Sequence, residues 1–288
     1  MKEQKDWKDI IYEKFKNEPL PEVFINKTEL QEKEINYNMK GSYWLQNTKH
    51  GAFLTDKNDF IGYKLIKYGV WEPEIIKIYE FLIQPHYVIV DIGAHMGFHT
   101  INFAKKGLQV YSFEPQKHLY NQVCGNIFLN DLNEKVICFN IGLGETSKQS
   151  SFGSINPHNT LNWEGNTGLE LINYGGRSLE DNLNTNEIEI RTLDSFNLSP
   201  NFIKIDVEGY ELKTFQGAYQ TLKNNKPVIL FESFPDFQPE VFKFLNNIGY
   251  EIWNIFQEDN FVALHPQFKE YNNIKNKFKN KWKIMHYK

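Results

Sequence analysis

An acidic residue and two glycines, spaced as Asp91-x-Gly93-x-x-x-Gly97, are the residues of this chain best suited to chemistry. They follow a short apolar run, Tyr87 to Val90, that predicts a buried strand. One glycine lets the backbone turn tightly after a strand, and a second lets a ligand approach the start of the next helix. The spacing therefore predicts a ligand-binding loop, in which Asp91 contacts the ligand or caps the helix.

His95 distinguishes this loop from a dinucleotide-binding loop. The dinucleotide fingerprint requires Gly-x-Gly-x-x-Gly, and His95 stands where the middle glycine belongs. A side chain there would crowd a pyrophosphate, so the loop favours a ligand without one, such as the amino-acid part of S-adenosylmethionine. Glu114, 23 residues after Asp91, ends the next predicted strand. An acid at that place accepts hydroxyl protons of a ribose, although a solvated strand-end acid is the alternative.

A second acidic group follows two later predicted strands. Alternation places Lys204, Asp206 and Glu208 on one face if the strand stays extended, and Glu232 ends a neighbouring strand. Charged groups at the end of a buried strand need partners or ligands. We expect Asp206 to act near the reacting atoms, with Glu208 and Glu232 in reserve and Lys204 in the site or paired with Asp206. Asp206 and Glu232 are only a weak signal for a divalent metal. Two histidines are further candidate bases: His99 and His158.

Five motifs occur in order along the chain: Tyr68-Gly-Val-Trp-Glu-Pro73, Val90-Asp-Ile-Gly-Ala-His-Met-Gly-Phe-His-Thr100, Phe113-Glu-Pro115, Asn126-Ile-Phe-Leu-Asn130 and Ile203-Lys-Ile-Asp-Val-Glu-Gly-Tyr-Glu211. Together they resemble the FkbM-type family of S-adenosylmethionine-dependent methyltransferases over about residues 50–235. The resemblance implies an α/β, Rossmann-like class I methyltransferase fold. Its sheet is mostly parallel and seven-stranded, with helices on both faces and an antiparallel edge hairpin. The family commonly has Asn where this chain has His95.

The resemblance also implies S-adenosyl-L-methionine as the methyl donor, and it assigns cofactor contacts. These contacts are Asp91, Gly93, His95 and Gly97 at the methionine end, and Glu114 at the ribose. Asn140, at the end of the third predicted strand, is expected at the adenine edge. Glu72, in the Trp-Glu-Pro step, either covers the cofactor or is an acid favoured at the start of a helix.

By the same resemblance, the reaction is O-methylation of a hydroxyl on a sugar, a glycan or a small natural-product-like acceptor. Aromatic residues of the insertion described below either stack on a sugar or pack ordinarily: Phe152, Trp163 and Tyr174. Two other functions stay open. One is an NAD-dependent oxidoreductase, which the missing middle glycine disfavours. The other is a non-catalytic binding module with a basic tail.

Alternating strands and helices must position these residues. The predicted buried strands are 87–90, 109–113, 136–140, 202–206 and 227–231. The predicted helices are 61–81 with a break at 71–73, 99–106, 117–129, 210–223 and 236–248. Such alternation is typical of right-handed crossovers and a mostly parallel sheet. Residues 250–255 and 261–264 are expected to form the antiparallel hairpin at the sheet edge.

Three regions are predicted along the chain. Residues 1–60 are a helical or accessory region, 61–266 the methyltransferase domain, and 267–288 a basic C-terminal helix or tail. Within the domain, the polar insertion 145–190 emerges at the carboxyl ends of the strands as a substrate flap or a decorative loop. The tail contains seven Lys and one Glu. Docking of its aromatic residues on the core is favoured over contact with an anionic membrane.

The overall composition is that of a globular protein, with 41% hydrophobic and 24% charged residues. A net charge of -4 makes nucleic acid an unexpected partner. The sequence contains no apolar run near the roughly 20 residues that span a bilayer, and its start lacks an apolar signal core. Cys124 and Cys138 are too few for a disulfide framework. We therefore expect a cytoplasmic protein, whose oligomeric state the sequence leaves open.

Overall fold

A computed structural model describes residues 43–106, 109–152, 160–162, 170–172, 174–175, 179–180, 188–255 and 259–281. Seven of its strands form a central sheet in the order β14-β15-β13-β12-β3-β4-β5. Their bounds are β3 (Val88–Ile92), β4 (Gln109–Phe113), β5 (Val136–Phe139), β12 (Phe202–Ile205), β13 (Val228–Glu232), β14 (Glu251–Asn254) and β15 (Asn260–Leu264). β12 pairs in parallel with both β3 and β13, whereas β15 is antiparallel to β13 and β14. The predicted mostly parallel sheet with an antiparallel edge hairpin is confirmed.

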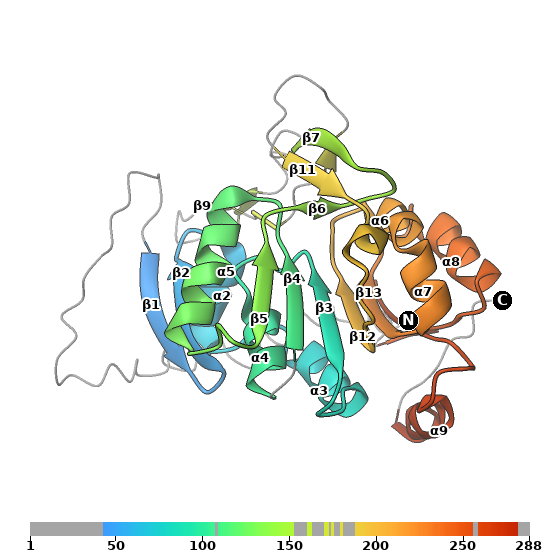
Figure 1. The fold of residues 1–288 in the computed structure, drawn as a ribbon. Coiled ribbons are helices and arrows are strands. Elements are labelled where there is room, and N and C mark those ends of the chain that lie inside the picture. Colours follow the sequence, from blue (N-terminus) through green and yellow to red (C-terminus); the bar gives the residue numbers. More distant parts are fainter. Residues whose placement is uncertain are drawn as a thin grey trace, which may run out of the picture.

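Helices cover both faces of this sheet (Figure 1). On one face lie α3 (Pro73–Leu82), α4 (Phe98–Lys105) and α5 (Lys117–Leu129), which share a core with Ile89 of β3. On the other lie α6 (Glu211–Gly217), α7 (Tyr219–Asn225) and α8 (Gln238–Asn247), which share a second core with Val90. Successive residues of β3 thus enter opposite cores, as the alternation of side chains along a strand requires.

Two predicted helices are interrupted in the structure. The break expected at 71–73 is present, because α2 (Phe60–Tyr68) ends at Gly69, whose φ of 68° is left-handed. The helix predicted over 210–223 is instead two helices, α6 and α7, separated at Ala218. A Cβ on Gly217 would lie 1.9 Å from the carbonyl oxygen of Gly144. The end of α6 therefore packs directly against another backbone segment.

Residues 43–56 form an antiparallel β-hairpin, which the prediction of a helical or accessory region over residues 1–60 did not include. β1 (Tyr43–Thr48) pairs with β2 (Gly51–Asp56) along the full length of both strands. The predicted helix around Trp7 lies outside the described residues. The hairpin therefore adds two strands that the hydrophobic periodicity did not predict.

Two asparagines of α5 hold this hairpin against the domain. Asn126 accepts a hydrogen bond from the backbone N–H of Leu54 at 2.5 Å, and Asn130 donates to the carbonyl oxygen of Ala52 at 2.6 Å. The two asparagines are one helical turn apart and share a face of α5. Asn126 also donates to the carbonyl oxygen of Met96 at 2.8 Å. This Asn-x-x-x-Asn motif thus connects the hairpin to the loop that follows β3.

Further strands lie in residues 142–191, a segment that includes the insertion 145–190. The small sheet has the order β10-β7-β11-β6, and a separate antiparallel pair joins β8 to β9. The bounds are β6 (Gly142–Leu143), β7 (Lys148–Phe152), β8 (Thr160–Asn162), β9 (Glu170–Ile172), β10 (Leu179–Glu180) and β11 (Ile188–Arg191). The small sheet lies beyond the carboxyl ends of the central strands (Figure 1). The side-chain hydroxyl of Thr214 in α6 donates to the carbonyl oxygen of Leu143 at 3.0 Å, which attaches β6 to the domain.

The C-terminal segment forms α9 (Tyr271–Lys281). Tyr271 and Ile274 are buried in the first core, and Lys275 forms an ion pair of 2.9 Å with Glu251 of β14. The helix therefore docks apolar side chains on the core, as predicted for its described part. None of the described helices has both the length and the apolar character that crossing a membrane requires.

Candidate active site

Asp91, the fourth residue of β3, is completely buried. The hydroxyl of Thr100 donates to its Oδ2 at 2.5 Å, and the same hydroxyl lies 3.1 Å from Ser112 Oγ of β4. Among the described residues, none makes a hydrogen bond to its other oxygen, Oδ1. A buried acceptor without a partner costs free energy unless a ligand or water completes it. Asp91 is therefore partly a structural residue and partly available to a ligand.

The two glycines of the loop adopt left-handed backbone conformations, with φ of 78° for Gly93 and 85° for Gly97. A Cβ on Gly93 would lie 1.8 Å from the carbonyl oxygen of Asp206, and one on Gly97 would lie 3.3 Å from Val123. The close approach that requires Gly93 is therefore made by the protein's own backbone after β12. This contact brings the loop after β3 directly against the segment that carries Asp206.

His95 also has a left-handed backbone, with φ of 53°. Its N–H donates to Glu114 Oε2 at 2.8 Å, and its ring Nε2 lies 3.5 Å from Asp59 Oδ1. A residue with a Cβ in this conformation costs about 1–3 kcal/mol and persists only where the surroundings hold it. Here the backbone of His95 contacts one acid while its side chain contacts another.

Glu114 is buried at the end of β4. Its Oε1 accepts the N–H of Gln116 at 2.8 Å, so each carboxylate oxygen receives one backbone hydrogen bond. Burial raises the pKa of Glu114 to about 7, although the N–H of Gln116 and the charge of His95 act in the opposite direction. The predicted ribose acid therefore lies in a formed hydrogen-bonding environment beside the loop.

Asn140 follows β5 and contacts the same turn. Its Nδ2 donates to the carbonyl oxygens of Glu114 and Pro115, both at 2.9 Å. The side-chain amide thus fixes the backbone that carries Glu114. Its predicted place at the adenine edge stays a prediction, while its contact with this turn is an observation.

Glu72 is the residue before α3 and has a left-handed backbone, with φ of 45°. Its carboxylate Oε2 lies 2.9 Å from Nε2 of the buried His99, and its side chain does not cap the helix. The simple helix-acid interpretation of Glu72 is therefore incomplete, because the side chain binds the first turn of α4 instead. His99, a candidate base, already has this acidic partner.

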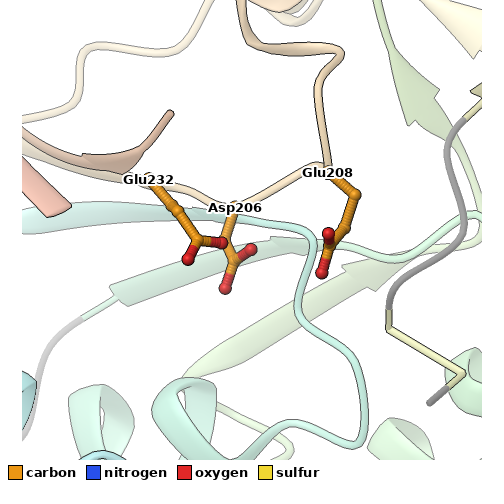
Figure 2. A group of neighbouring side chains, drawn as sticks. All are labelled: Asp206, Glu208 and Glu232. Atoms are coloured by element: carbon orange, nitrogen blue, oxygen red, sulfur yellow. The ribbon is translucent and has the colours of Figure 1, made fainter. Parts of the chain in front are cut away.

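Three carboxylates converge at the ends of two neighbouring strands (Figure 2). One oxygen from each of Asp206, Glu208 and Glu232 lies within 4.8 Å of the others. Lys204 Nζ donates to Asp206 Oδ2 at 3.0 Å, which realises the predicted pairing of these two residues. Glu208 joins the group through a left-handed turn, with φ of 53°, after β12 has ended at Ile205. The predicted residues do meet, although not along an extended strand.

The charges of this acidic group are unequal. Burial alone would raise the pKa of Asp206, but the ammonium of Lys204 lowers it on balance. Burial and the charge of Asp206 raise the pKa of Glu208 to about 8 and that of Glu232 to about 10. At neutral pH the group therefore holds its negative charge on Asp206 and keeps protons on Glu208 and Glu232.

The same three oxygens are also the ligand type that a hard divalent cation prefers. Such an ion would have to displace protons from Glu208 and Glu232 and lie beside the Lys204 ammonium. The arrangement therefore favours a proton-sharing group, in which Lys204 is the resident cation.

Two residues singled out from the insertion cannot be placed, and a third can. His158 and Trp163 lie outside the described residues. The carbonyl oxygen of Tyr174 accepts a hydrogen bond from Gln116 Nε2 at 2.7 Å, which brings the insertion to the turn after Glu114. The sequence did not identify Asp59 as a site residue, because an aspartate before a helical run indicates only a helix cap.

Comparison with known proteins supports a family assignment. Residues 91–252 match the family model described as "Methyltransferase FkbM domain". No curated protein sequence matches the chain significantly.

Solved structures give more distant likenesses. The FkbM methyltransferase from Methylobacillus flagellatus KT is 19% identical, with a TM-score of 0.45, over 64% of this chain and 45% of its own. The M. jannaschii tRNA m1G37 methyltransferase is 13% identical, with a TM-score of 0.44, over 78% of this chain and 56% of its own. This chain thus spans about half the length of these two proteins. The likenesses are too distant to carry an argument about activity.

The family match begins at Asp91 of the glycine loop and ends within β14 of the edge hairpin. It covers more than half of the chain and both groups of candidate residues, the loop with Glu114 and the acids after β12 and β13. The chain therefore belongs to the FkbM family of S-adenosylmethionine-dependent methyltransferases.

Proposed function

We propose that this protein transfers a methyl group from S-adenosylmethionine to a hydroxyl of a sugar, a glycan or a small natural-product-like acceptor. The observation that carries the proposal is the contact between Gly93 and the backbone of Asp206, where a Cβ on the glycine would lie 1.8 Å from the carbonyl oxygen. This contact brings a candidate cofactor loop and a candidate base together. Family membership supports methyl transfer over the nicotinamide-dependent alternative.

The residues at the loop fit the proposed cofactor. Asp91 Oδ1 is a buried acceptor with no hydrogen-bond partner among the described residues, and it suits the ammonium group of a methionine moiety. Each oxygen of Glu114 accepts one backbone N–H and keeps a further lone pair for a ribose hydroxyl. His95 occupies the loop where a pyrophosphate would need a glycine. The donor and acceptor types therefore favour S-adenosylmethionine over a dinucleotide.

The acidic group provides for alignment and proton removal. When bound, S-adenosylmethionine supplies a methyl group already activated on a sulfonium. Asp206 accepts a hydrogen bond from Lys204 at Oδ2, which leaves the carboxylate ionised and restrains its orientation. In the proposed reaction Asp206 orients the acceptor hydroxyl and receives its proton. Alignment supplies most of the rate, and a base adds roughly 10²–10⁴-fold.

The surroundings of the acidic group support a carbohydrate-like acceptor. The ring of Phe237 lies within 2.8 Å of where a Cβ on Gly209 would be, directly after Glu208. Phe237 is 44% exposed, so part of its ring is open to a ligand. An exposed ring beside carboxylates suits a ligand that combines an apolar face with hydroxyl groups.

The test pairs cofactor binding with turnover. We expect S-adenosylhomocysteine, but not NAD, to raise the melting temperature, and radiolabelled S-adenosylmethionine to methylate hydroxyl acceptors from a panel of glycosides. Asp206→Asn should lower turnover per folded molecule at least about 100-fold. The folded fraction is measured separately, because the variant leaves the buried Lys204 ammonium without its charged partner. Glu240→Gln, at an exposed acid of α8, is the matched control. Stabilisation by NAD alone would overturn the proposal, and full activity of Asp206→Asn would remove Asp206 as the base.

A further inference from the structure

Asp59 lies outside the segment that matches the family, yet its side chain reaches the candidate cofactor loop. It is 2% exposed and forms the N-cap of α2, where Oδ2 accepts the N–H of Gly62 at 2.8 Å. Its second oxygen, Oδ1, lies 3.5 Å from Nε2 of His95. The cap of α2 uses only this one carboxylate oxygen of Asp59. The second oxygen is thus a buried acceptor directed at the loop.

His95 lies among three acids from three different elements. These are Asp59 before α2, Glu114 after β4 and Asp206 after β12. Burial lowers the pKa of His95, but Asp59, followed by the other two acids, raises it above its ordinary value. The imidazolium form therefore persists to a higher pH than in free histidine.

For Glu114, burial raises the pKa and so favours the neutral carboxylic acid. Its pKa is raised to about 7, and Asp91 of β3 adds to this effect. The charge of His95 acts against it and favours the carboxylate. Asp59, His95 and Glu114 therefore form a buried row in which a base lies between two acids. Asp56 is a further acid beside Asp59.

We propose that Asp59 is a positioning residue that acts through His95 to keep Glu114 available as an acceptor for the ribose hydroxyls of the cofactor. The inference rests on the proposed function, since it assumes that Glu114 meets a ribose. It adds a residue from outside the family domain to the site. Protonated Glu114 would place a hydrogen where one of the two ribose hydroxyls must donate, so its ionised form is the one that binds.

The sign of the pH effect follows from these contacts. Asp59→Asn keeps an oxygen for the helix cap but removes the charge that holds the proton on His95. Neutral His95 then supports the Glu114 carboxylate less, and Glu114 takes up a proton near neutral pH. At higher pH Glu114 ionises without help. The variant should therefore bind S-adenosylhomocysteine at least fivefold more weakly near pH 7 and regain most of that loss near pH 9.

The experiment is calorimetry with S-adenosylhomocysteine across this pH range on four proteins. They are the unaltered chain, Asp59→Asn, His95→Asn and the double variant. The control is Asp194→Asn, because the Asp194 carboxylate also accepts N–H groups at the start of a helix, those of Gln220 at 2.9 Å and Thr221 at 2.8 Å in α7, but it lies outside the loop. We expect Asp59→Asn to have little further effect once His95 is Asn, which is the signature of action through His95.

A second measurement does not depend on the cofactor. Histidine ring signals in NMR spectra should show His95 titrating at a lower pH in Asp59→Asn than in the unaltered chain. Equal loss of affinity at every pH, or an unchanged His95 titration, would overturn the inference and leave Asp59 as a helix cap only. Failure of the unaltered chain to bind S-adenosylhomocysteine at any pH would instead overturn the proposed function, while the titration would still test the pairing.

Discussion

The two halves of the site balance charge in opposite ways. Around the loop after β3, the base His95 lies between the acids Asp59 and Glu114, and Glu114 accepts two backbone N–H groups. At the ends of β12 and β13, the carboxylates of Asp206, Glu208 and Glu232 converge, and one ammonium, from Lys204, pairs with Asp206. In the first half, each acid already has a hydrogen-bond or charged partner, as in a ligand-binding surface. In the second half, neighbouring acids must share protons.

This difference assigns separate tasks to the two halves. Groups that only bind a ligand are best fixed in one state, whereas groups that move a proton need environments that push their pKa values apart. The pKa values in the acidic group are separated in that way, low for Asp206, about 8 for Glu208 and about 10 for Glu232. Variants in the loop half should therefore change cofactor binding, and variants in the acidic group should change turnover.

Lys204→Met should have the largest effect, because it removes the cation paired with Asp206. Burial would then raise the pKa of Asp206, and the proton-accepting carboxylate would be lost at neutral pH. We expect turnover to fall at least about 100-fold, with the affinity for S-adenosylhomocysteine changed far less. Kinetics normalised to the folded fraction by circular dichroism would measure this. Lys223→Met, at an exposed position of α7, is the control. An equal loss of cofactor affinity would contradict the separation of the two halves.

Glu114→Ala should have an intermediate effect, confined to the binding half. Removing charge-assisted hydrogen bonds to a ribose should weaken S-adenosylhomocysteine binding by about 1.5–3 kcal/mol. The acidic group is left intact, so turnover at saturating cofactor should stay within a few-fold of the unaltered chain. Calorimetry and saturation kinetics measure the two quantities separately. Unchanged affinity would remove Glu114 from the cofactor site.

The sequence predicted the strand ends well, because buried parallel strands are apolar runs that stop at a polar residue. Asp91, Glu114, Asp206 and Glu232 were all located this way, and the sheet brings their strands together. Local sequence patterns were thus enough to locate these strand-end residues wherever strands and helices alternate along the chain.

The rest of the site depends on contacts between segments far apart in sequence. The tight approach at Gly93 comes from the backbone of Asp206, 113 residues later, which no local pattern encodes. Asp59 looked like an ordinary cap, and the hairpin before it has no sustained apolar alternation. Glu208 reaches the acidic group through a left-handed turn, although alternation assumed an extended strand. Each of these features is decided by tertiary packing and not by residue type.

The last expected effect is on stability and not on catalysis, through the protons that the acidic group retains. Folded Glu232, with a pKa of about 10, holds a proton that the unfolded chain releases near its ordinary value of about 4.3. Between these values the folded state binds more protons, so the free energy of unfolding should fall as pH rises. Glu232→Gln should flatten this slope in urea denaturation from about pH 5 to 9, while the exposed Glu240→Gln should not. An unchanged slope would mean that Glu232 is ionised in the folded protein, and the acidic group would then resemble the charge-balanced half of the site.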